Sequence, residues 1–165
     1  MTKLAFPNVS GDVFVLDEAA LEEGFTASRK SPRKRIILPI HRAQGDLVQR
    51  MLNFFQPGTY VRPHIHPNES ASETIFVIRG KIGFLIFDEH GEIQSTHLLE
   101  PGGLIDIVPG VWHGMVALEA DTVILETKRG PYDDTDKHFA AWAPEEGGPA
   151  AEELTGRFES LFAAG

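Results

Sequence analysis

The feature that most constrains the fold is a succession of short apolar runs between residues 35 and 128. The runs are rich in Ile, Val, Phe and Tyr, which favour strands, and turn residues such as Gly and Pro separate many of them. They cover residues 35–40, 46–55, 59–66, 74–79, 82–88, 92–99, 104–108, 113–118 and 121–128. Short strands at such intervals predict an all-β barrel or sandwich with antiparallel neighbours.

The segments outside this region predict a few further elements. Residues 12–17 predict one more strand, and residues 18–25 predict a short helix that ends at Gly24. Residues 145–153 have the composition of a linker. Beyond them, apolar residues recur at helical spacing and predict a helix that docks on the barrel or on a second subunit: Leu154, Phe158, Leu161 and Phe162.

Length and the lack of an internal repeat indicate one domain. The 165 residues are enough to bury a core without disulfides, because domains of roughly 100–200 residues commonly do so. We therefore expect a single domain over residues 1–165, with a core at about 35–130 and a C-terminal extension at about 145–165.

Composition limits the chemistry. The chain has no cysteine, so a metal ion would have to bind imidazole, carboxylate or backbone oxygen. A formal net charge of -9 argues against nucleic-acid binding. No run approaches the roughly 20 apolar residues of a membrane span, and the first residues lack the apolar stretch of a secretion signal. We expect a cytoplasmic protein that binds neither nucleic acid nor membrane.

Charged residues are unevenly distributed along the chain. A basic cluster is formed by Arg29, Lys30, Arg33, Lys34 and Arg35. Acidic residues gather towards the C-terminus: Asp133, Asp134, Asp136, Glu145, Glu146, Glu152, Glu153 and Glu159. The basic cluster is either a solvated turn or a patch that attracts an anionic ligand.

Three histidines and one glutamate have the spacing of a metal site. His64 and His66 lie two residues apart in a predicted strand, so both rings share one face. If residues 67–72 close a hairpin, Glu73 lies opposite His66 and joins that face. His113 begins a later strand and can approach from the facing sheet. Single histidines are more often core or surface residues, but four residues at these positions favour one divalent ion such as Fe, Mn, Ni, Zn or Cu.

These residues resemble the two motifs of the cupin superfamily. The first motif is matched by Gly58, His64, His66, Glu73 and Gly80, and the second by Gly103, Pro109, Gly110 and His113. Two departures stand out. Ala117 stands where the second motif often has Asn. The gap between His66 and Glu73 is longer than in the motif, which makes Glu69 an alternative ligand, whereas the spacing to Gly80 favours Glu73.

The resemblance implies a fold and a cofactor. The implied fold is a double-stranded β-helix, or jelly-roll, barrel with a short N-terminal helix and a C-terminal helical extension. The implied cofactor is one divalent transition metal, held by His64, His66, Glu73 and His113. Barrels of this type commonly pair, so a homodimer is expected.

Longer stretches resemble the WbuC-type cupin-fold metalloproteins. They are RMLNFFQPGTYVRPHIHP, ETIFVIRGKIGFLIFDEHG, PGVWHGMV and ILETKRGPYDDTDKHFAAWAPEE. The resemblance covers roughly residues 26–146. It implies a metal-binding barrel of a kind often encoded among polysaccharide or O-antigen biosynthesis functions, and it implies no particular reaction.

Strand alternation predicts further residues around the metal. Tyr60 and Arg62 are expected on the face of His64, where Arg62 either binds an anionic ligand or pairs with a carboxylate inside the barrel. If residues 113–118 and 121–128 form a hairpin, Glu126 and Lys128 also face inward, and Glu126 can accept a hydrogen bond from a ligating imidazole. The candidate catalytic residues are Tyr60, Glu126 and Lys128, and the candidate ligand-binding residues are Tyr60, Arg62 and Lys128.

The leading functional hypothesis is a metal-dependent protein acting on a small polar, anionic metabolite. A sugar or sugar-nucleotide derivative is one candidate substrate, and both isomerisation and dioxygenation fit the metal site. The alternative is a non-catalytic protein that binds or senses a small molecule through its metal. A third reading is a structural barrel in which the metal only stabilises the fold.

Overall fold

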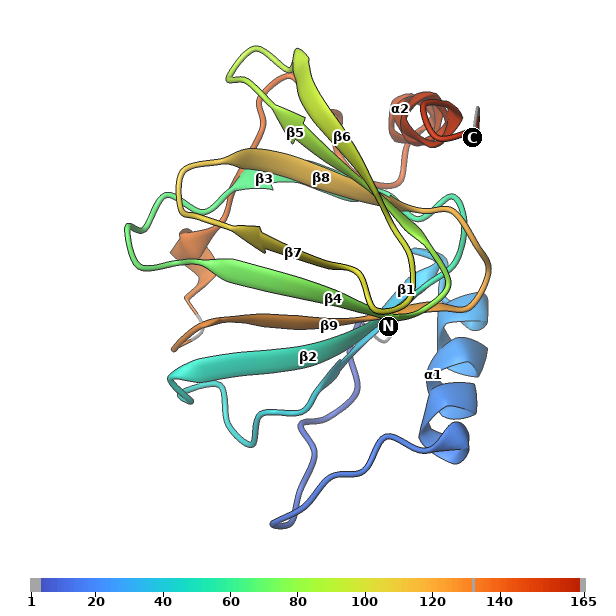
Figure 1. The fold of residues 1–165 in the computed structure, drawn as a ribbon, viewed down its shortest axis with the longest axis vertical. Helices are drawn as coiled ribbons and strands as arrows, with labels where there is room; N and C mark the ends of the chain where they lie inside the picture. Colours follow the sequence, from blue (N-terminus) through green and yellow to red (C-terminus); the bar gives the residue numbers. More distant parts are fainter. Residues whose placement is uncertain (1–3, 132, 164–165) are drawn as a thin grey trace.

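The structure, a computed structural model, describes residues 4–131 and 133–163. Its strands form two five-stranded sheets that face each other (Figure 1). The first sheet has the order β1 (Arg35–Pro39), β2 (Val48–Phe55), β9 (Thr122–Arg129), β4 (Glu73–Arg79) and β7 (Leu104–Ile107). The second has the order β10 (His138–Phe139), β3 (Val61–Ile65), β8 (Trp112–Ala117), β5 (Ile82–Phe87) and β6 (Ile93–Leu99). The paired strands of both sheets are antiparallel, which confirms the predicted jelly-roll barrel.

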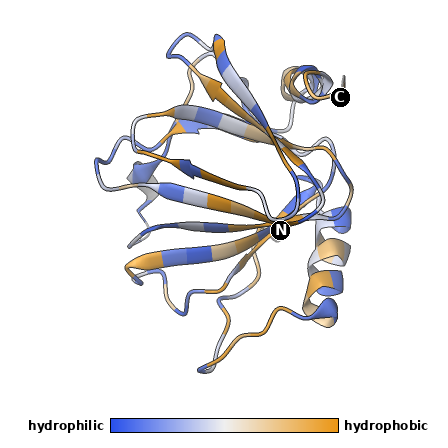
Figure 2. Ribbon diagram, in the orientation of Figure 1, coloured by the Kyte–Doolittle hydropathy of each residue, from blue (hydrophilic) through white to orange (hydrophobic). Residues whose placement is uncertain are grey.

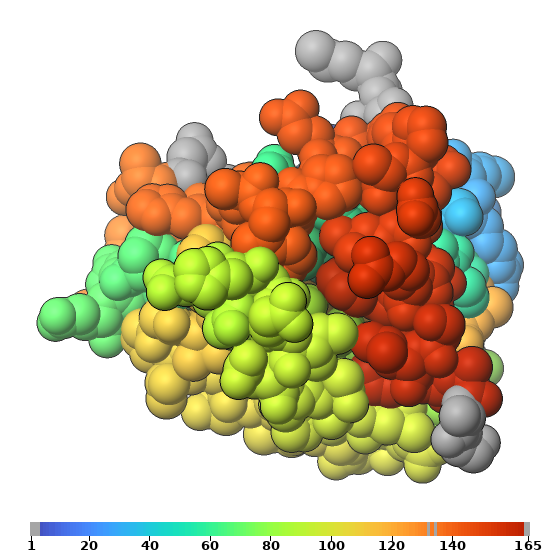
Figure 3. Space-filling model, turned by 90° about the horizontal axis from the view of Figure 1, so that it is seen from above, coloured from blue at the N-terminus to red at the C-terminus, as the bar shows by residue number. Residues whose placement is uncertain are grey.

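Two helices pack on the outside of the barrel (Figure 1). Helix α1 (Glu18–Lys30) lies against β1 and β2, and helix α2 (Pro149–Ser160) lies against β8. Phe158 of α2 packs with Leu85 and Phe87 of β5, so the predicted docking of the C-terminal helix on the barrel is confirmed. Figure 3 shows α2 in red beside the lime-green β5 and β6 hairpin, with the orange segment after β9 lying next to both.

Apolar side chains fill three layers. Between the sheets lie residues such as Phe55, Ile75, Phe84, Met115 and Ile124. The outer face of the first sheet packs on α1, and that of the second packs on α2. Figure 2 shows hydrophobic residues interspersed with hydrophilic ones along the strands of both sheets, as expected for strands whose two faces differ.

Two local predictions in the N-terminal region are wrong. Gly24 does not end α1 but lies buried within it. A Cβ at this position would clash with the ring of Phe54 on β2, so a larger residue does not fit. Glycine therefore serves a close approach of helix and sheet. Residues 12–17 do not form a strand: Val13 and Val15 are exposed, and the segment leads as irregular chain to Asp17, which caps α1. At the other end, the predicted linker is only partly correct, since α2 begins at Pro149.

Two predicted hairpins are also wrong. Strands β3 and β4 belong to different sheets, as do β8 and β9. The loop after His66 crosses between the sheets, so Glu73 is paired with Lys128 of β9 and Ile107 of β7 and not with His66. Crossings of this kind let side chains from both sheets meet inside the barrel.

The basic and acidic clusters meet in part. Glu146 accepts hydrogen bonds from Arg33 at 3.0 Å and from Arg35 at 3.0 Å, and Arg29 forms an ion pair with Asp121. Three of the five basic residues are therefore paired with carboxylates. Across the described chain, no helix has the length and apolar character needed to cross a membrane.

Candidate metal centre

The four predicted metal-ligand residues meet inside the barrel. His64 and His66 come from β3 and the residue after it, His113 from β8 of the same sheet, and Glu73 from β4 of the facing sheet. One ligand atom from each lies within 4.8 Å of the others, and all four side chains are buried. The predicted convergence is confirmed, and Glu73 rather than Glu69 completes the set.

Each imidazole is oriented by a backbone carbonyl. The Nδ1 atoms of His64, His66 and His113 lie 2.9, 2.7 and 2.9 Å from the carbonyl oxygens of Arg62, Asp136 and Val111. Because a carbonyl oxygen only accepts, Nδ1 carries the proton and Nε2 is left with a free lone pair. Metal-ligating histidines are held in this way, so the three rings are prepared to bind through Nε2.

The side-chain atoms at the centre lack other partners. Glu73 Oε2 lies 3.2 Å from His66 Nε2 and 3.4 Å from His113 Nε2. Neither contact has hydrogen-bond geometry: within the described part of the chain, Glu73 Oε2 and His113 Nε2 are buried without a hydrogen-bond partner. Buried polar atoms of this kind cost free energy unless something satisfies them. A divalent transition-metal ion would satisfy them, and three imidazoles with one carboxylate are a donor set that such ions accept.

Burial and charge set the titration of the centre in the absence of metal. Burial lowers the pKa of His64 well below its usual value, which favours the neutral ring that a metal requires. Burial would raise the pKa of Glu73, but the nearby rings of His113 and His66 outweigh it and lower that pKa well below its usual range. Both shifts favour the protonation states of metal ligands.

Tyr60 and Arg62 lie at the start of β3, where the strict alternation expected from the sequence is interrupted. Val61 pairs with Met115 and His64 with His113, so a β-bulge adds one residue between them. The hydroxyl of Tyr60 donates to the carbonyl of Pro144 at 2.8 Å, and burial raises the pKa of Tyr60 to about 12. The guanidinium of Arg62 lies 5.1 Å from the centre of the Phe139 ring and 3.4 Å from the carbonyl oxygen of Ala140. Both side chains thus contact the segment that follows β9.

Glu126 and Lys128 face the barrel interior as predicted, although for a different reason. Their strand, β9, pairs with β4, where Lys128 lies opposite Glu73 and Glu126 lies opposite Ile75. Asn53 of β2 donates to Glu126 Oε2 at 2.9 Å. Burial, together with the neighbouring Glu73 carboxylate, raises the pKa of Glu126 to about 7. The expected hydrogen bond from an imidazole to Glu126 is replaced by the backbone carbonyls.

Lys137 is a candidate site residue that sequence reasoning missed. This residue has extended backbone and lies two positions before Phe139, which pairs with His64. By alternation Lys137 shares the inward face. Burial lowers its pKa, and the carboxylates of Glu126 and Glu73 act against that shift, which places its ammonium group within their electrostatic reach. Within the described residues, Lys137 forms no ion pair or hydrogen bond through its side chain.

Comparison with solved structures supports the fold assignment. A variant of oxalate decarboxylase from Bacillus subtilis is 19% identical, with a TM-score of 0.51 over 64% of this chain and 27% of that chain. A structure of oxalate oxidase is 16% identical, with a TM-score of 0.51 over 82% of this chain and 76% of that chain. This chain therefore spans about a quarter of the length of the decarboxylase. No curated protein matches it in sequence.

The two facing sheets define a protein of the cupin-fold class, and its interior contains a candidate metal site of three histidines and one glutamate. Within that class, residues 16–99 match a family described as a domain of unknown function, DUF6016. The match extends over more than half of the 165 residues, so the chain belongs to this family.

Proposed function

We propose that the protein is a metal-dependent enzyme that acts on a small carboxylate-bearing metabolite. The observation that carries the proposal is one inward-facing polar surface. It combines four buried metal-ligand residues with three half-buried charged groups, which are Glu126, Lys128 and Lys137. A structural metal would require only the ligands. The additional charged groups are costly to bury and have a purpose if an anion binds beside the metal.

The chain offers a separate task to each group. Lys137 and Lys128 lie close to Glu73 and so to the metal centre. Their positive charges would attract a negatively charged group and position it there. Glu126, held by Asn53, is placed to accept or donate a proton. A bound divalent ion would supply Lewis acidity towards a carbonyl or carboxylate oxygen. Tyr60 and Arg62, whose contacts are made elsewhere, are not needed for this reaction.

Proton transfer, as in an isomerisation, is the reaction type that these side chains support best. Glu126 provides the group that such a reaction needs, whereas a dioxygenase depends chiefly on a redox-active metal. Both similar proteins, oxalate decarboxylase and oxalate oxidase, are named for oxalate, which is itself a small carboxylate. Sugar acids are among the substrates that this proposal admits.

The closer kinship with WbuC-type proteins and a homodimeric state also belong to this proposal. The stretches that carry the WbuC resemblance supply His64, His66, Glu73, His113 and Lys137. Sedimentation of the metal-loaded protein would test the dimer.

A comparison of binding and turnover tests the proposal. Metal-loaded protein would be screened with hydroxy acids, keto acids and sugar acids by thermal shift, and the binders would then be assayed for conversion and for oxygen consumption. We expect Glu126→Gln to keep its metal and still bind the acid, while turnover falls by about 10²–10⁴-fold. Full turnover by Glu126→Gln would refute its role.

Lys137→Met provides the matching test of anion binding. We expect it to keep the metal and to bind the acid more weakly, while Lys34→Met, a lysine outside the barrel interior, should behave like the wild type. Tight binding of an acid without conversion by any variant or by the wild type would instead support a binding or sensing role.

A further inference from the structure

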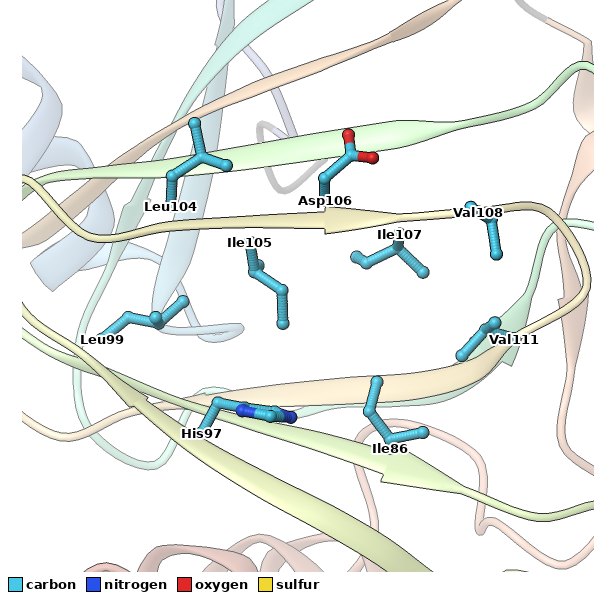
Figure 4. A pocket seen from close by; sticks show the side chains of 9 residues that line it. All are labelled: Ile86, His97, Leu99, Leu104, Ile105, Asp106, Ile107, Val108 and Val111. Carbon is cyan, nitrogen blue, oxygen red and sulfur yellow. The ribbon is translucent and has the colours of Figure 1, made fainter.

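A cavity of about 360 Å³ opens between the edge strands of the two sheets. It lies where β6 ends one sheet and β7 ends the other (Figure 4). Most of its lining is apolar: Ile86, Leu99, Leu104, Ile105, Ile107, Val108 and Val111, with His97 and Asp106 as the polar members. In Figure 4, Ile105 and Ile107 point from β7 towards His97 and Ile86 on the opposite sheet.

The inner wall of this cavity adjoins the metal centre. Ile107 lies opposite Glu73 in the pairing of β7 with β4, and Ile86 lies opposite His113 in the pairing of β5 with β8. Directly opposed residues share a face and have neighbouring side chains. The cavity and two of the ligand residues are therefore separated by a single strand spacing.

The buried ring of Phe84 is a second neighbour of both sites. The ring of Phe84 stacks on the ring of His113 with centroids 5.7 Å apart. Phe84 also lies opposite His97, one of the residues that line the cavity. Phe84 thus lies next to both a ligand residue and a residue of the cavity lining.

We infer that this cavity is a subsite for the apolar part of the substrate, whose carboxylate binds at the metal centre. The inference rests on the proposed function and narrows it to carboxylates that carry a hydrocarbon chain or ring. A volume of about 360 Å³ falls within the roughly 300–1,000 Å³ of small-molecule sites. The apolar lining disfavours a free sugar, because its hydroxyl groups would lose hydrogen bonds to water.

A second copy of the chain is the competing occupant. Leu98, Leu104 and Val108 are exposed along the two edges and would suit a protein partner. A partner resting on these edges would cover the cavity without extending to the wall beside His113 and Glu73. The pairing of Ile107 with Glu73 and of Ile86 with His113 puts the cavity beside the metal centre, which favours a small molecule.

Straight-chain carboxylates from acetate to decanoate provide the test. Their affinity for metal-loaded protein would be measured by calorimetry. We expect affinity to rise about fourfold for each added methylene, until the cavity is full. Equal affinity along the series would overturn the inference.

Two neighbouring residues on β6 give a matched pair of variants. Leu99 lines the cavity, whereas Leu98 is exposed. We expect Leu99→Trp to abolish the dependence on chain length while acetate still binds, and Leu98→Trp to leave the dependence unchanged. If Leu99→Trp does not fold, Ile105→Phe fills the same space from the other sheet.

Metal content separates this inference from the proposed function. Protein that binds neither metal nor acetate would contradict the proposed function itself. Protein that binds both, with no dependence on chain length, would contradict only the subsite. The protein could instead form a dimer that Leu98→Asp dissociates, with decanoate binding only after dissociation. That result would show that a second copy covers the cavity, and it would also overturn the inference.

Discussion

Removal of His113 should abolish metal-linked stabilisation. A ligand that binds only the folded protein stabilises it by about 4 kcal/mol at a thousandfold excess over its Kd. For a chain of 165 residues, each 1 kcal/mol changes the unfolding temperature by roughly 2–4 °C. We therefore expect a saturating divalent metal to raise the Tm of the wild-type protein by about 8–16 °C.

His113→Gln should lose this increase for a structural reason. The ring of His113 is 1% exposed and supplies one of four converging ligand atoms, so no surface residue can replace it. The variant should also be less stable without metal by about 1–3 kcal/mol, because its contact with Phe84 is lost. Scanning calorimetry with and without EDTA, together with elemental analysis of the purified protein, would measure both effects.

An exposed histidine provides the control. His90 lies in the turn after β5, and its side chain is 79% exposed, so His90→Gln should show the full shift of the wild-type protein. If His113→Gln kept one equivalent of metal and the full increase in Tm, the ligand set would be incorrect.

Three further predictions concern stability and pH. Gly24→Ala should destabilise the protein by about 1–3 kcal/mol, because the added methyl group clashes with Phe54. Gly156→Ala on α2 has open space around it and should stabilise the protein by about 0.5–1 kcal/mol. Urea denaturation measures both variants, and equal effects would contradict the packing of α1. Phe158→Ala should cost about 3–5 kcal/mol if α2 is docked as described, and an unchanged urea midpoint would argue against that docking. Burial raises the pKa of Tyr60 to about 12 from an ordinary value of 10.0. The stability due to its neutral phenol should therefore be present below pH 10 and be lost between pH 10 and 12. Tyr60→Phe should remove that loss, and a pH profile of stability that the substitution leaves unchanged would contradict the burial of the hydroxyl.

The strands were predictable because each carries its own local signal. Alternating or continuous apolar runs bounded by turn residues mark β2, β4, β5 and β9 within one or two residues of their ends. Gly24 was misread because a glycine in a helix looks the same whether it ends the helix or allows a close contact. That distinction depends on Phe54, which is 30 positions later in the chain.

The ligand set was predictable, but the geometry that assembles it was not. The His-x-His pair and the spacing of Glu73 and His113 are visible in the sequence, whereas the assignment of each strand to a sheet depends on distant pairing. Glu126 was placed inward through a hairpin that does not exist, and it faces inward because β9 pairs with β4. The register shift between Val61 and His64 leaves no mark in the sequence, so the alternation along this strand cannot be predicted from it. Lys137 lies outside the strand series and has no motif of its own.

Three ligand residues stand on one sheet and the fourth on the other. An ion held by all four would fasten the two halves of the sandwich to each other at its centre. Dissociation of the ion would then require the two sheets to separate. The rate of metal release should therefore follow the transient opening of the barrel and not the exchange of water at an open surface. Hydrogen exchange of the backbone amides of β4 and β8 would be measured with and without metal. Metal binding should slow exchange in both strands together.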